Sequence, residues 1–178
     1  MIIGLGYKAK SGKDLVAVHL IREYGFIKTA FAETLKNACG EIFHLNKEQL
    51  HGRKKEMIDS YWGVTPRYIL QKVGTECMRN GFADDIWIKS LHRKILKNPG
   101  NYVITDVRFP NEADAVLDWG GKLIRVDRIN SGASGGIEKH ASEVSLDDYT
   151  KWNYILKNDG TVEELFQKID EVMKSVAI

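Results

Sequence analysis

The sequence predicts an α/β fold in which five strands form a parallel sheet between two layers of helices. The first observation is alternation, because apolar runs alternate along the chain with segments whose apolar residues recur every three or four positions. Strands that are joined through helices pair in parallel, and helices then cover both faces of the sheet. The second observation is size, since 178 residues, 43% of them hydrophobic, suit one globular domain.

Five apolar runs are the expected strands, and the segments between them show helical spacing. The strands are expected at 2–5, 26–32, 101–109, 122–129 and 152–158. The helices are expected at 13–24, 33–43, 67–80, 86–97, 112–121 and 161–176. Gly25 suits the end of the first helix, and Thr65-Pro66 suits the start of the third. Because the sequence contains no long linker, we expect a single domain over residues 1–178.

Charge and composition narrow the class of protein. The 26 Lys and Arg residues are nearly balanced by 24 Asp and Glu, which argues against a nucleic acid polymer as the partner. The sequence has no apolar run near the roughly 20 residues of a membrane span. It also lacks the basic start and apolar core of a signal peptide, so we expect a cytoplasmic protein without a membrane partner. Cys39 and Cys77 have no metal-ligand spacing and are expected to be buried thiols.

Residues 2–20 carry the clearest chemical signal. A short strand is followed by a loop with Gly6 and Gly12, then by Lys13 and a helix. A phosphate-binding P-loop requires this order, because the first N–H groups of a helix have no intrahelical partner and carry the positive end of its dipole. A loop folded over them forms a cradle for an anion. Lys13 can then reach the outer phosphates of a nucleotide.

The match to the pattern G-x-x-x-x-G-K-[ST] has two departures. Tyr7 stands where the pattern has glycine, with Gly6 one residue early, and Asp14 stands where it has Ser or Thr. Magnesium prefers oxygen ligands, so the Asp14 carboxylate can hold the ion directly or through water. The alternative is a lysine-rich turn before an amphipathic helix, which the position after an N-terminal strand disfavours.

Ligands of a parallel sheet bind at the carboxyl ends of its strands, and this rule selects further candidates. They are Asp106 and Arg108 after the third strand, Arg128 after the fourth, and residues 158–160 after the fifth. The Arg108 guanidinium can clamp a phosphate with two hydrogen bonds. Asp106 can hold a magnesium-bound water, or it can form a structural ion pair with Arg108.

Five blocks of the sequence resemble, in this order, the bacteriophage-type deoxynucleoside monophosphate kinases. They are GLGYKAKSGKD, LQKVGTECMR, YVITDVRFPNEAD, HASE and ILKNDGTVEEL. The resemblance covers nearly the whole chain, and ITDVRFPNEA and NDGT are its most specific parts. It implies a P-loop NTPase fold in three α/β/α layers, with the strand order 2-3-1-4-5. It also implies ATP and a deoxynucleoside monophosphate (dNMP) as substrates and Mg²⁺ as cofactor.

The resemblance implies roles for the loop after the first strand and for the strand ends. Lys13 should span the β- and γ-phosphates, and backbone N–H groups of Ala9, Lys10, Ser11, Gly12, Lys13 and Asp14 should hold the β-phosphate. Asp14 and Asp106 are the expected magnesium ligands, and Arg128 is the favoured transition-state cation, whereas Arg125 is expected to be structural. Asn158, Asp159 and Gly160 should meet the adenine of ATP, mainly through backbone groups.

The acceptor is expected to bind a helical segment at about 33–98 and to be covered by a lid at about 129–147. Candidate acceptor ligands besides Arg108 are Lys8, Lys36, Arg79, His140 and Glu143. The alternatives are solvated lysines, a surface arginine at a helix C-terminus for Arg79, and a local hydrogen bond for His140 and Glu143. If a phage encodes the protein, we expect it in the cytoplasm of the host. The oligomeric state is left open, with a homodimer as one option.

Three functions fit these observations. The first is a dNMP kinase that transfers the γ-phosphate of ATP and releases ADP and dNDP. The second is a kinase for another small acceptor, of the dephospho-coenzyme A kinase type. The third is a regulatory protein that binds nucleotide without transfer, which Tyr7 and Leu15 favour because Leu15 stands where such kinases often have a hydroxyl. Lys13, Asp106, Arg108 and the glycine-rich segment favour an enzyme.

Overall fold

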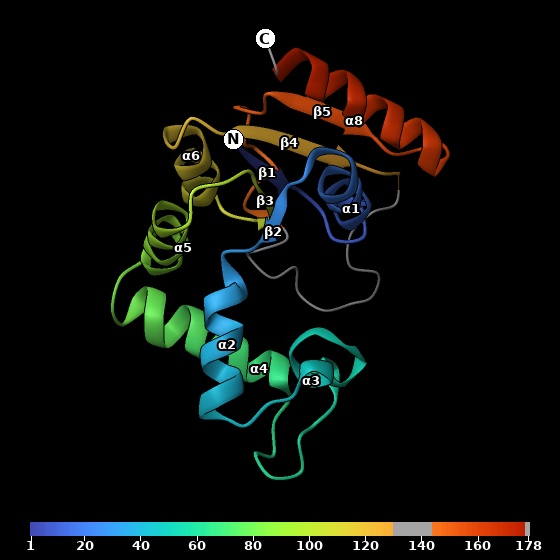
Figure 1. The fold of residues 1–178 in the computed structure, drawn as a ribbon. Coiled ribbons are helices and arrows are strands. Elements are labelled where there is room, and N and C mark those ends of the chain that lie inside the picture. Colours follow the sequence, from blue (N-terminus) through green and yellow to red (C-terminus); the bar gives the residue numbers. More distant parts are fainter. Residues whose placement is uncertain (130–143, 177–178) are drawn as a thin grey trace. The chain divides into compact units, whose positions relative to one another are not determined.

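A computed structural model of the chain describes residues 1–129 and 144–176. The described strands form one parallel sheet in the order β2-β3-β1-β4-β5, which confirms the predicted topology (Figure 1). The strands are β1 (Ile2–Gly6), β2 (Ile27–Thr29), β3 (Tyr102–Val107), β4 (Lys122–Asp127) and β5 (Tyr154–Lys157). The carboxyl ends of β1, β3 and β4 therefore meet at one edge of the sheet.

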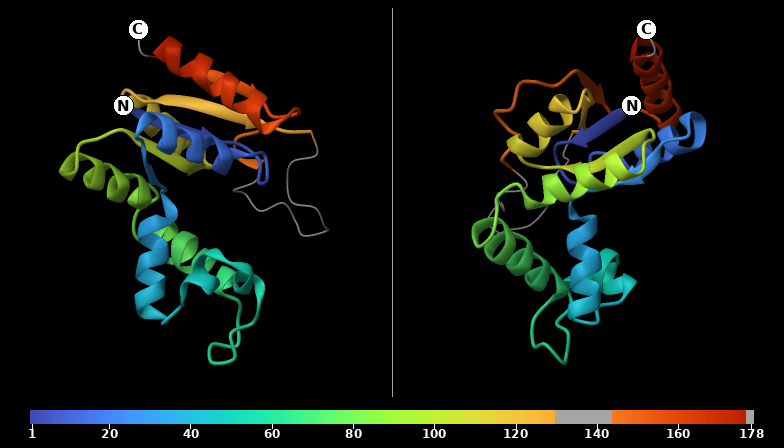
Figure 2. Two further views of the ribbon diagram at one scale, coloured as in Figure 1. Left: turned by 45° about the vertical axis from the view of Figure 1, so that its right-hand side comes forward. Right: turned by 60° about the vertical axis from the view of Figure 1, so that its left-hand side comes forward.

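Helices cover both faces of this sheet. On one face α1 (Lys13–Tyr24) and α8 (Val162–Val176) pack over Ile3 and Leu5 in a continuous core. On the other face α6 (Pro110–Asp118) approaches β1 so closely that a Cβ on Gly4 would lie 3.2 Å from Val116. Side chains alternate between the faces of a strand, so this arrangement is the predicted three-layer fold (Figure 1, Figure 2).

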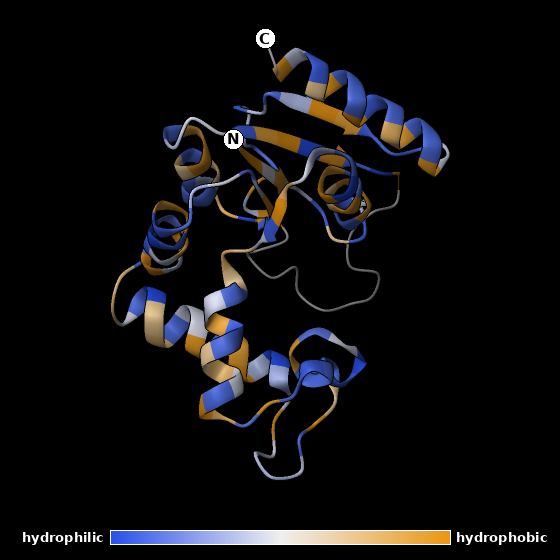
Figure 3. Cartoon of the chain, in the orientation of Figure 1, coloured by the Kyte–Doolittle hydropathy of each residue, from blue (hydrophilic) through white to orange (hydrophobic). Residues whose placement is uncertain are grey.

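Continuous apolar sequence explains why the middle strands are internal. Every residue of β1 is buried, and the first three residues of β3 are buried as well. Parallel strands covered on both faces have such runs, whereas α8 alternates between hydrophobic and hydrophilic residues (Figure 3). Among the described residues we find no helix with the length and apolar character needed to cross a membrane.

The chain divides into two compact units. Residues 1–30 and 99–178 make up the first unit, which contains the sheet. Residues 31–98 make up the second, which is helical. Its elements are α2 (Ala32–Ile42), α3 (Lys47–His51), η1 (Arg53–Glu56), α4 (Pro66–Gln71), η2 (Lys72–Asn80) and α5 (Ile86–Lys97). The role in acceptor binding that the sequence assigns to about 33–98 stays a prediction.

The predicted strand at 26–32 is too long. The structure ends β2 at Thr29, opposite Ile104 of β3, and begins α2 at Ala32. β2 is an edge strand with β3 as its single neighbour in the sheet, so its length is set by that one pairing.

The predicted helix at 67–80 is not uniform. After α4 the chain continues as a π-helix, η2, whose wider turns begin at Lys72. Gly74 explains the local packing, because a Cβ there would lie 2.5 Å from Leu35 and because the Trp87 indole donates to its carbonyl at 3.0 Å. Tertiary contacts therefore override the local helical pattern.

The prediction for the two cysteines is half wrong. Cys39 is buried, and burial raises the pKa of its thiol to about 11. Cys77 is exposed, since three positions along the wide η2 helix turn it away from the buried face of Gly74.

A polar contact joins the two helices on one face of the sheet. The Asp170 carboxylate of α8 lies 2.7 Å from His19 Nε2 and accepts a hydrogen bond of 2.7 Å from the Tyr24 hydroxyl. Phe166 stacks on the His19 ring with 4.3 Å between centroids. The hydrogen bonds from His19 and Tyr24 lower the pKa of Asp170, and the bond to Asp170 raises the pKa of Tyr24 to about 12.

We expect Asp170→Asn to lower the melting temperature at pH 7 by a few degrees, corresponding to about 1 kcal/mol after discounting for solvent screening. The folded-state pKa of Asp170 is lowered, so the stabilisation is present above the unfolded pKa of about 4. It is lost as the pH falls through the folded-state pKa, and the difference between the two proteins should shrink there. Thermal melts from pH 7 to pH 2 measure this, with the neighbouring exposed Glu171→Gln as control. An equal effect of both variants at pH 7 contradicts the prediction.

Candidate active site at the carboxyl ends of the strands

The loop between β1 and α1 leads directly into the helix N-terminus. Gly12 is the N-cap, with φ of 108°, and its carbonyl accepts from the N–H groups of Leu15 and Val16 at 3.0 and 3.2 Å. In the described part of the chain, no side chain caps this end of α1. The positive end of the helix dipole therefore faces the loop, as an anion site requires.

The Lys13 side chain folds back into this loop. Its ammonium donates to the carbonyl of Tyr7 at 3.1 Å, to the carbonyl of Lys8, and to the Ser11 hydroxyl at 3.4 Å. These oxygens hold the charge at the centre of the loop, at the start of α1. The structure thus holds Lys13 within the predicted loop, and its contact with outer phosphates stays a prediction.

Asn158 fixes the second half of the loop. Its side-chain amide is buried and donates to the Ser11 carbonyl at 2.8 Å. A Cβ on Gly12 would collide with this amide, so both the left-handed backbone and the lack of space require glycine there. The sequence predicts contact between residues 158–160 and adenine, but it gives no sign of this contact between Asn158 and the loop.

The structure explains the departure from the P-loop pattern at Tyr7 and the place of the neighbouring Gly6. Gly6 has no room for a side chain, because a Cβ would lie 2.5 Å from the Trp152 ring. Tyr7 adopts φ of 91°, a conformation that favours glycine, and so takes the backbone role of the glycine it replaces. The Arg125 guanidinium lies 3.7 Å from the centroid of the Tyr7 ring. The glycine of the pattern is thus replaced in backbone conformation, although not in size.

A cavity of about 450 Å³ opens beside this loop, where β1, β4 and β5 end. Four cationic side chains line it, from Lys8, Arg125, Arg128 and Lys157. Its other lining residues are the carboxylates Asp127 and Asp159, together with Tyr7 and Ile129. Arg125 pairs with Asp127 at 2.7 Å, and Asp159 accepts from the backbone N–H of Ile129 at 2.9 Å. Arg128 is exposed just after β4. The excess of positive charge suits an anionic ligand.

Asp106 and Arg108 lie at the end of β3, next to the strand that carries the loop. Val107 between them is in register with Gly6 of β1. Buried Glu112 accepts from the backbone N–H groups of Arg108 and Phe109 at 2.9 and 3.3 Å, which fixes the turn into α6. The structure therefore places both residues at the sheet edge that the sequence rule selects.

The carboxylates predicted for magnesium have chemistry that suits the ion. Asp14 lies in the exposed first turn of α1 and pairs with Lys28 at 3.0 Å. No cluster of three or more His, Cys, Asp or Glu is found in the described residues. Mg²⁺ typically uses one or two carboxylates and completes its shell with water and phosphate oxygens, so Asp14 and Asp106 are each of the chemical type that the ion binds.

The remaining predicted ligands are dispersed. Lys8 forms an ion pair with Asp147. In the helical unit Lys36 Nζ lies 3.4 Å from His51 Nδ1. The Arg79 side chain is only 9% exposed and lies 3.8 Å from Asp84, so it is not the surface arginine of the alternative interpretation. His140, Glu143 and most of the predicted lid lie outside the described residues.

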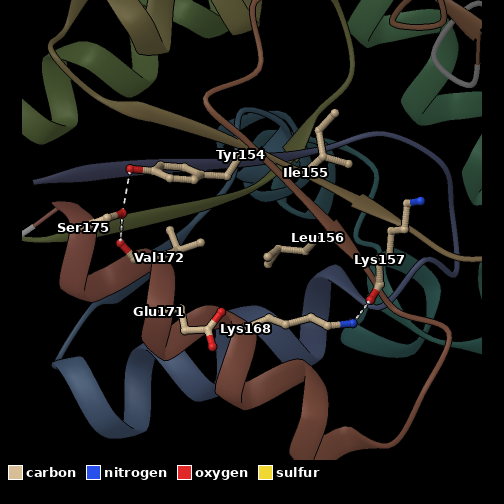
Figure 4. A pocket seen from close by; sticks show the side chains of 8 residues that line it. All are labelled: Tyr154, Ile155, Leu156, Lys157, Lys168, Glu171, Val172 and Ser175. Carbon is tan, nitrogen blue, oxygen red and sulfur yellow. Dashed lines mark hydrogen bonds between the residues drawn. The ribbon is translucent and has the colours of Figure 1, made fainter.

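A second hollow, of about 620 Å³, lies between β5 and α8 (Figure 4). Its floor is apolar, and Lys168 donates across it to the Lys157 carbonyl at 2.7 Å. The Tyr154 and Ser175 hydroxyls pair at 2.9 Å at its other end. Lys168 thus covers a backbone acceptor of the edge strand, which is a common protection of such edges. The cavity lined by Tyr7 and Lys8, with its excess of positive charge, therefore suits an anionic ligand better than this hollow does.

Comparison with known proteins shows what this chain is similar to. A protein of Acanthamoeba polyphaga mimivirus, named for deoxynucleotide monophosphate kinase, is 39% identical over 95% of this chain and 94% of its own length. The deoxynucleotide monophosphate kinase of Enterobacteria phage T4 is 31% identical over 66% of this chain, which spans 48% of the phage protein. Dephospho-CoA kinase from Campylobacter jejuni shares the fold alone, with 16% identity, a TM-score of 0.53, and coverage of 98% of this chain and 96% of that one.

The model of one protein family matches residues 41–169, which cover most of the helical unit, part of the sheet-containing unit and all of β3. Together with the mimivirus relative, this match confirms the resemblance that the sequence blocks suggest. The chain belongs to the deoxynucleotide monophosphate kinase family.

Proposed function

We propose that this protein transfers the γ-phosphoryl group of ATP to a phosphate oxygen of a dNMP, giving dNDP and ADP. The observation that carries the proposal is the Lys13 ammonium, held by loop oxygens at the N-terminus of α1 in a member of this kinase family. Phosphoryl transfer needs in-line positioning and positive charge rather than a protein nucleophile. Lys13 and the cations that line the cavity would supply the positive charge, and no Ser-His-Asp constellation is needed.

The ATP phosphates are assigned to the loop. Backbone N–H groups of residues 9 to 14 would hold the β-phosphate, and Lys13 would exchange its loop carbonyls for β- and γ-phosphate oxygens. Residues 158–160 would meet the adenine by backbone groups, since the Asn158 side chain already bonds Ser11. Arg128, exposed beside the cavity, would neutralise charge that develops on transfer.

The acceptor phosphate is assigned to Arg108 at the end of β3. Its guanidinium can hold two phosphate oxygens and so fix the line of attack. Lys36 and Arg79 of the helical unit, together with Lys8, remain candidates for acceptor contacts. Asp14 and Asp106 would hold Mg²⁺, which when bound neutralises phosphate charge and orients the phosphate oxygens.

A coupled assay of ADP release tests the reaction class. Each of the four common dNMPs, dephospho-coenzyme A and a no-acceptor control would be supplied with ATP and Mg²⁺. ADP release that depends on a dNMP supports the proposal. Release with dephospho-coenzyme A alone, or nucleotide binding with no acceptor-dependent release, would overturn it.

We expect Lys13→Ala to reduce turnover by more than about a hundredfold while the melting temperature changes little, because the loss of an outer-phosphate cation costs several kcal/mol in the transition state. Steady-state kinetics and thermal melts measure the two effects. A variant that keeps more than about a tenth of the wild-type turnover, a loss below about 1.4 kcal/mol, would remove Lys13 from the mechanism.

We expect Asp14→Asn to raise the Mg²⁺ concentration needed for half-maximal activity by about tenfold, because a neutral amide is a poorer ligand for a hard cation. Asp14→Ser, which restores the hydroxyl of the usual pattern, should partly reverse the change. Lys28→Met is the matched control, since it removes the partner of Asp14 and leaves the carboxylate. The same Mg²⁺ dependence in wild type and Asp14→Asn contradicts this assignment.

We expect Arg108→Lys to raise KM for the dNMP by about tenfold and to lower turnover, with little change in KM for ATP, because lysine keeps the charge and loses the bidentate fork. Asp106→Asn should instead lower turnover with nearly normal KM values. Both variants are compared by varying each substrate separately. If Arg108→Lys weakens ATP and leaves the dNMP unaffected, the two nucleotide sites are assigned the wrong way round.

A further inference from the structure

Tyr7 has an unusual backbone for a residue with a large side chain. Its φ of 91° lies in the left-handed region, where a Cβ crowds the neighbouring peptide groups. Such conformations persist only where surrounding contacts impose them, and they concentrate at functional sites. The contacts around Tyr7 should therefore show what holds its backbone in this conformation.

Lys8 of the loop lies over the Tyr7 ring at 5.0 Å from its centroid, and a closer cation comes from the sheet. Arg125 is the register partner of Gly6 on the adjacent strand β4, so it is fixed beside the residue that precedes Tyr7. Its guanidinium stacks on the Tyr7 ring at 3.7 Å from the centroid, and its Nε donates to Asp127 at 2.7 Å. A guanidinium held by a carboxylate at one edge can still present its face to an aromatic ring.

The same backbone directs a carbonyl at Lys13. The Tyr7 carbonyl accepts from the Lys13 ammonium at 3.1 Å. A rotation about φ of Tyr7 would change the direction of the following peptide and with it the place of the Lys8 carbonyl, which also accepts from Lys13. The position of the phosphate-binding cation thus depends on the conformation of Tyr7.

We propose that Tyr7 is a positioning residue: its stack on Arg125 holds the left-handed backbone that places Lys13 at the centre of the loop. The part of this inference that concerns nucleotide affinity rests on the proposed function. The part that concerns how strongly the loop is ordered without nucleotide does not depend on the proposed function. Arg125, which sequence analysis leaves as structural, then acts on the loop through Tyr7.

A rival explanation predicts the opposite effect of Tyr7→Gly on the order of the loop. If Tyr7 is merely tolerated where the pattern has glycine, Tyr7→Gly removes a strain and should order the loop or leave it unchanged. If the stack positions the loop, Tyr7→Gly removes the contact that fixes a now freely rotating backbone. The loop should then lose order and the nucleotide should bind more weakly, although the substitution restores the usual residue.

The experiment compares Tyr7→Gly, Tyr7→Leu and Tyr7→Phe in the full chain. Hydrogen exchange of the amides at residues 8–13 is measured without nucleotide, and the Kd for ADP is measured by calorimetry. Tyr7→Phe keeps the ring and should behave like wild type within about twofold, whereas Tyr7→Gly and Tyr7→Leu should exchange faster and bind ADP about tenfold more weakly. Arg125→Leu should have the same effects, and adding it to Tyr7→Leu should change Kd by less than about twofold.

His44→Gly is the matched control for strain, because His44 is exposed in the helical unit with φ of 53° and is not part of a stack among the described contacts. It should raise the melting temperature or leave it unchanged, while Tyr7→Gly should lower it. Exchange in Tyr7→Gly that equals or falls below that of wild type overturns the proposal. Failure of wild type to bind ADP would refute the proposed function, and the exchange measurement would still decide the role of Tyr7.

Discussion

The close approach of the loop after β1 to the turn after β5 is the constraint on which the site depends. The Asn158 amide reaches the Ser11 carbonyl at 2.8 Å, and this contact leaves no space for a side chain on Gly12. The contact satisfies a buried carbonyl that the helix cannot use, and it fixes the point where α1 begins. Lys13 follows at once, so a side chain 147 positions beyond Ser11 in the chain helps to fix the point from which Lys13 extends.

The fold could be predicted because it rests on patterns that are local in sequence. The apolar runs of β1 and β3 and the helical spacing of α8 appear in single segments, and the parallel arrangement follows from their alternation. The strand order came from the resemblance, not from the patterns. The errors lie where a distant partner decides the local structure: β2 ends where its single pairing ends, and η2 widens where Gly74 meets Leu35 and Trp87.

The same division holds for the site. The rule that ligands lie at strand ends selected Asp106, Arg108, Arg128 and the segment 158–160, and these residues do lie where β3, β4 and β5 end, whereas their roles stay predictions. The sequence analysis missed the stack of Arg125 on Tyr7. This contact requires that β1 and β4 are neighbours and that Arg125 lies beside Gly6. The predicted order 2-3-1-4-5 already implied that neighbourhood. The register between Gly6 and Arg125 is the added fact that the sequence did not contain.

The site also explains how a nearly neutral chain can bind a highly charged ligand. Lys8 pairs with Asp147, Arg125 with Asp127 and Lys28 with Asp14, while Lys13 lies against backbone carbonyls. Each internal partner lowers the repulsion among cations gathered around one loop. A phosphate bound by one of these cations would replace an acceptor that the cation already has. The net gain in free energy would be the difference between the interaction with phosphate and the interaction with that acceptor. Backbone carbonyls are weaker acceptors for an ammonium than phosphate oxygens are, so that difference should be larger for Lys13 than for the cations that carboxylates hold.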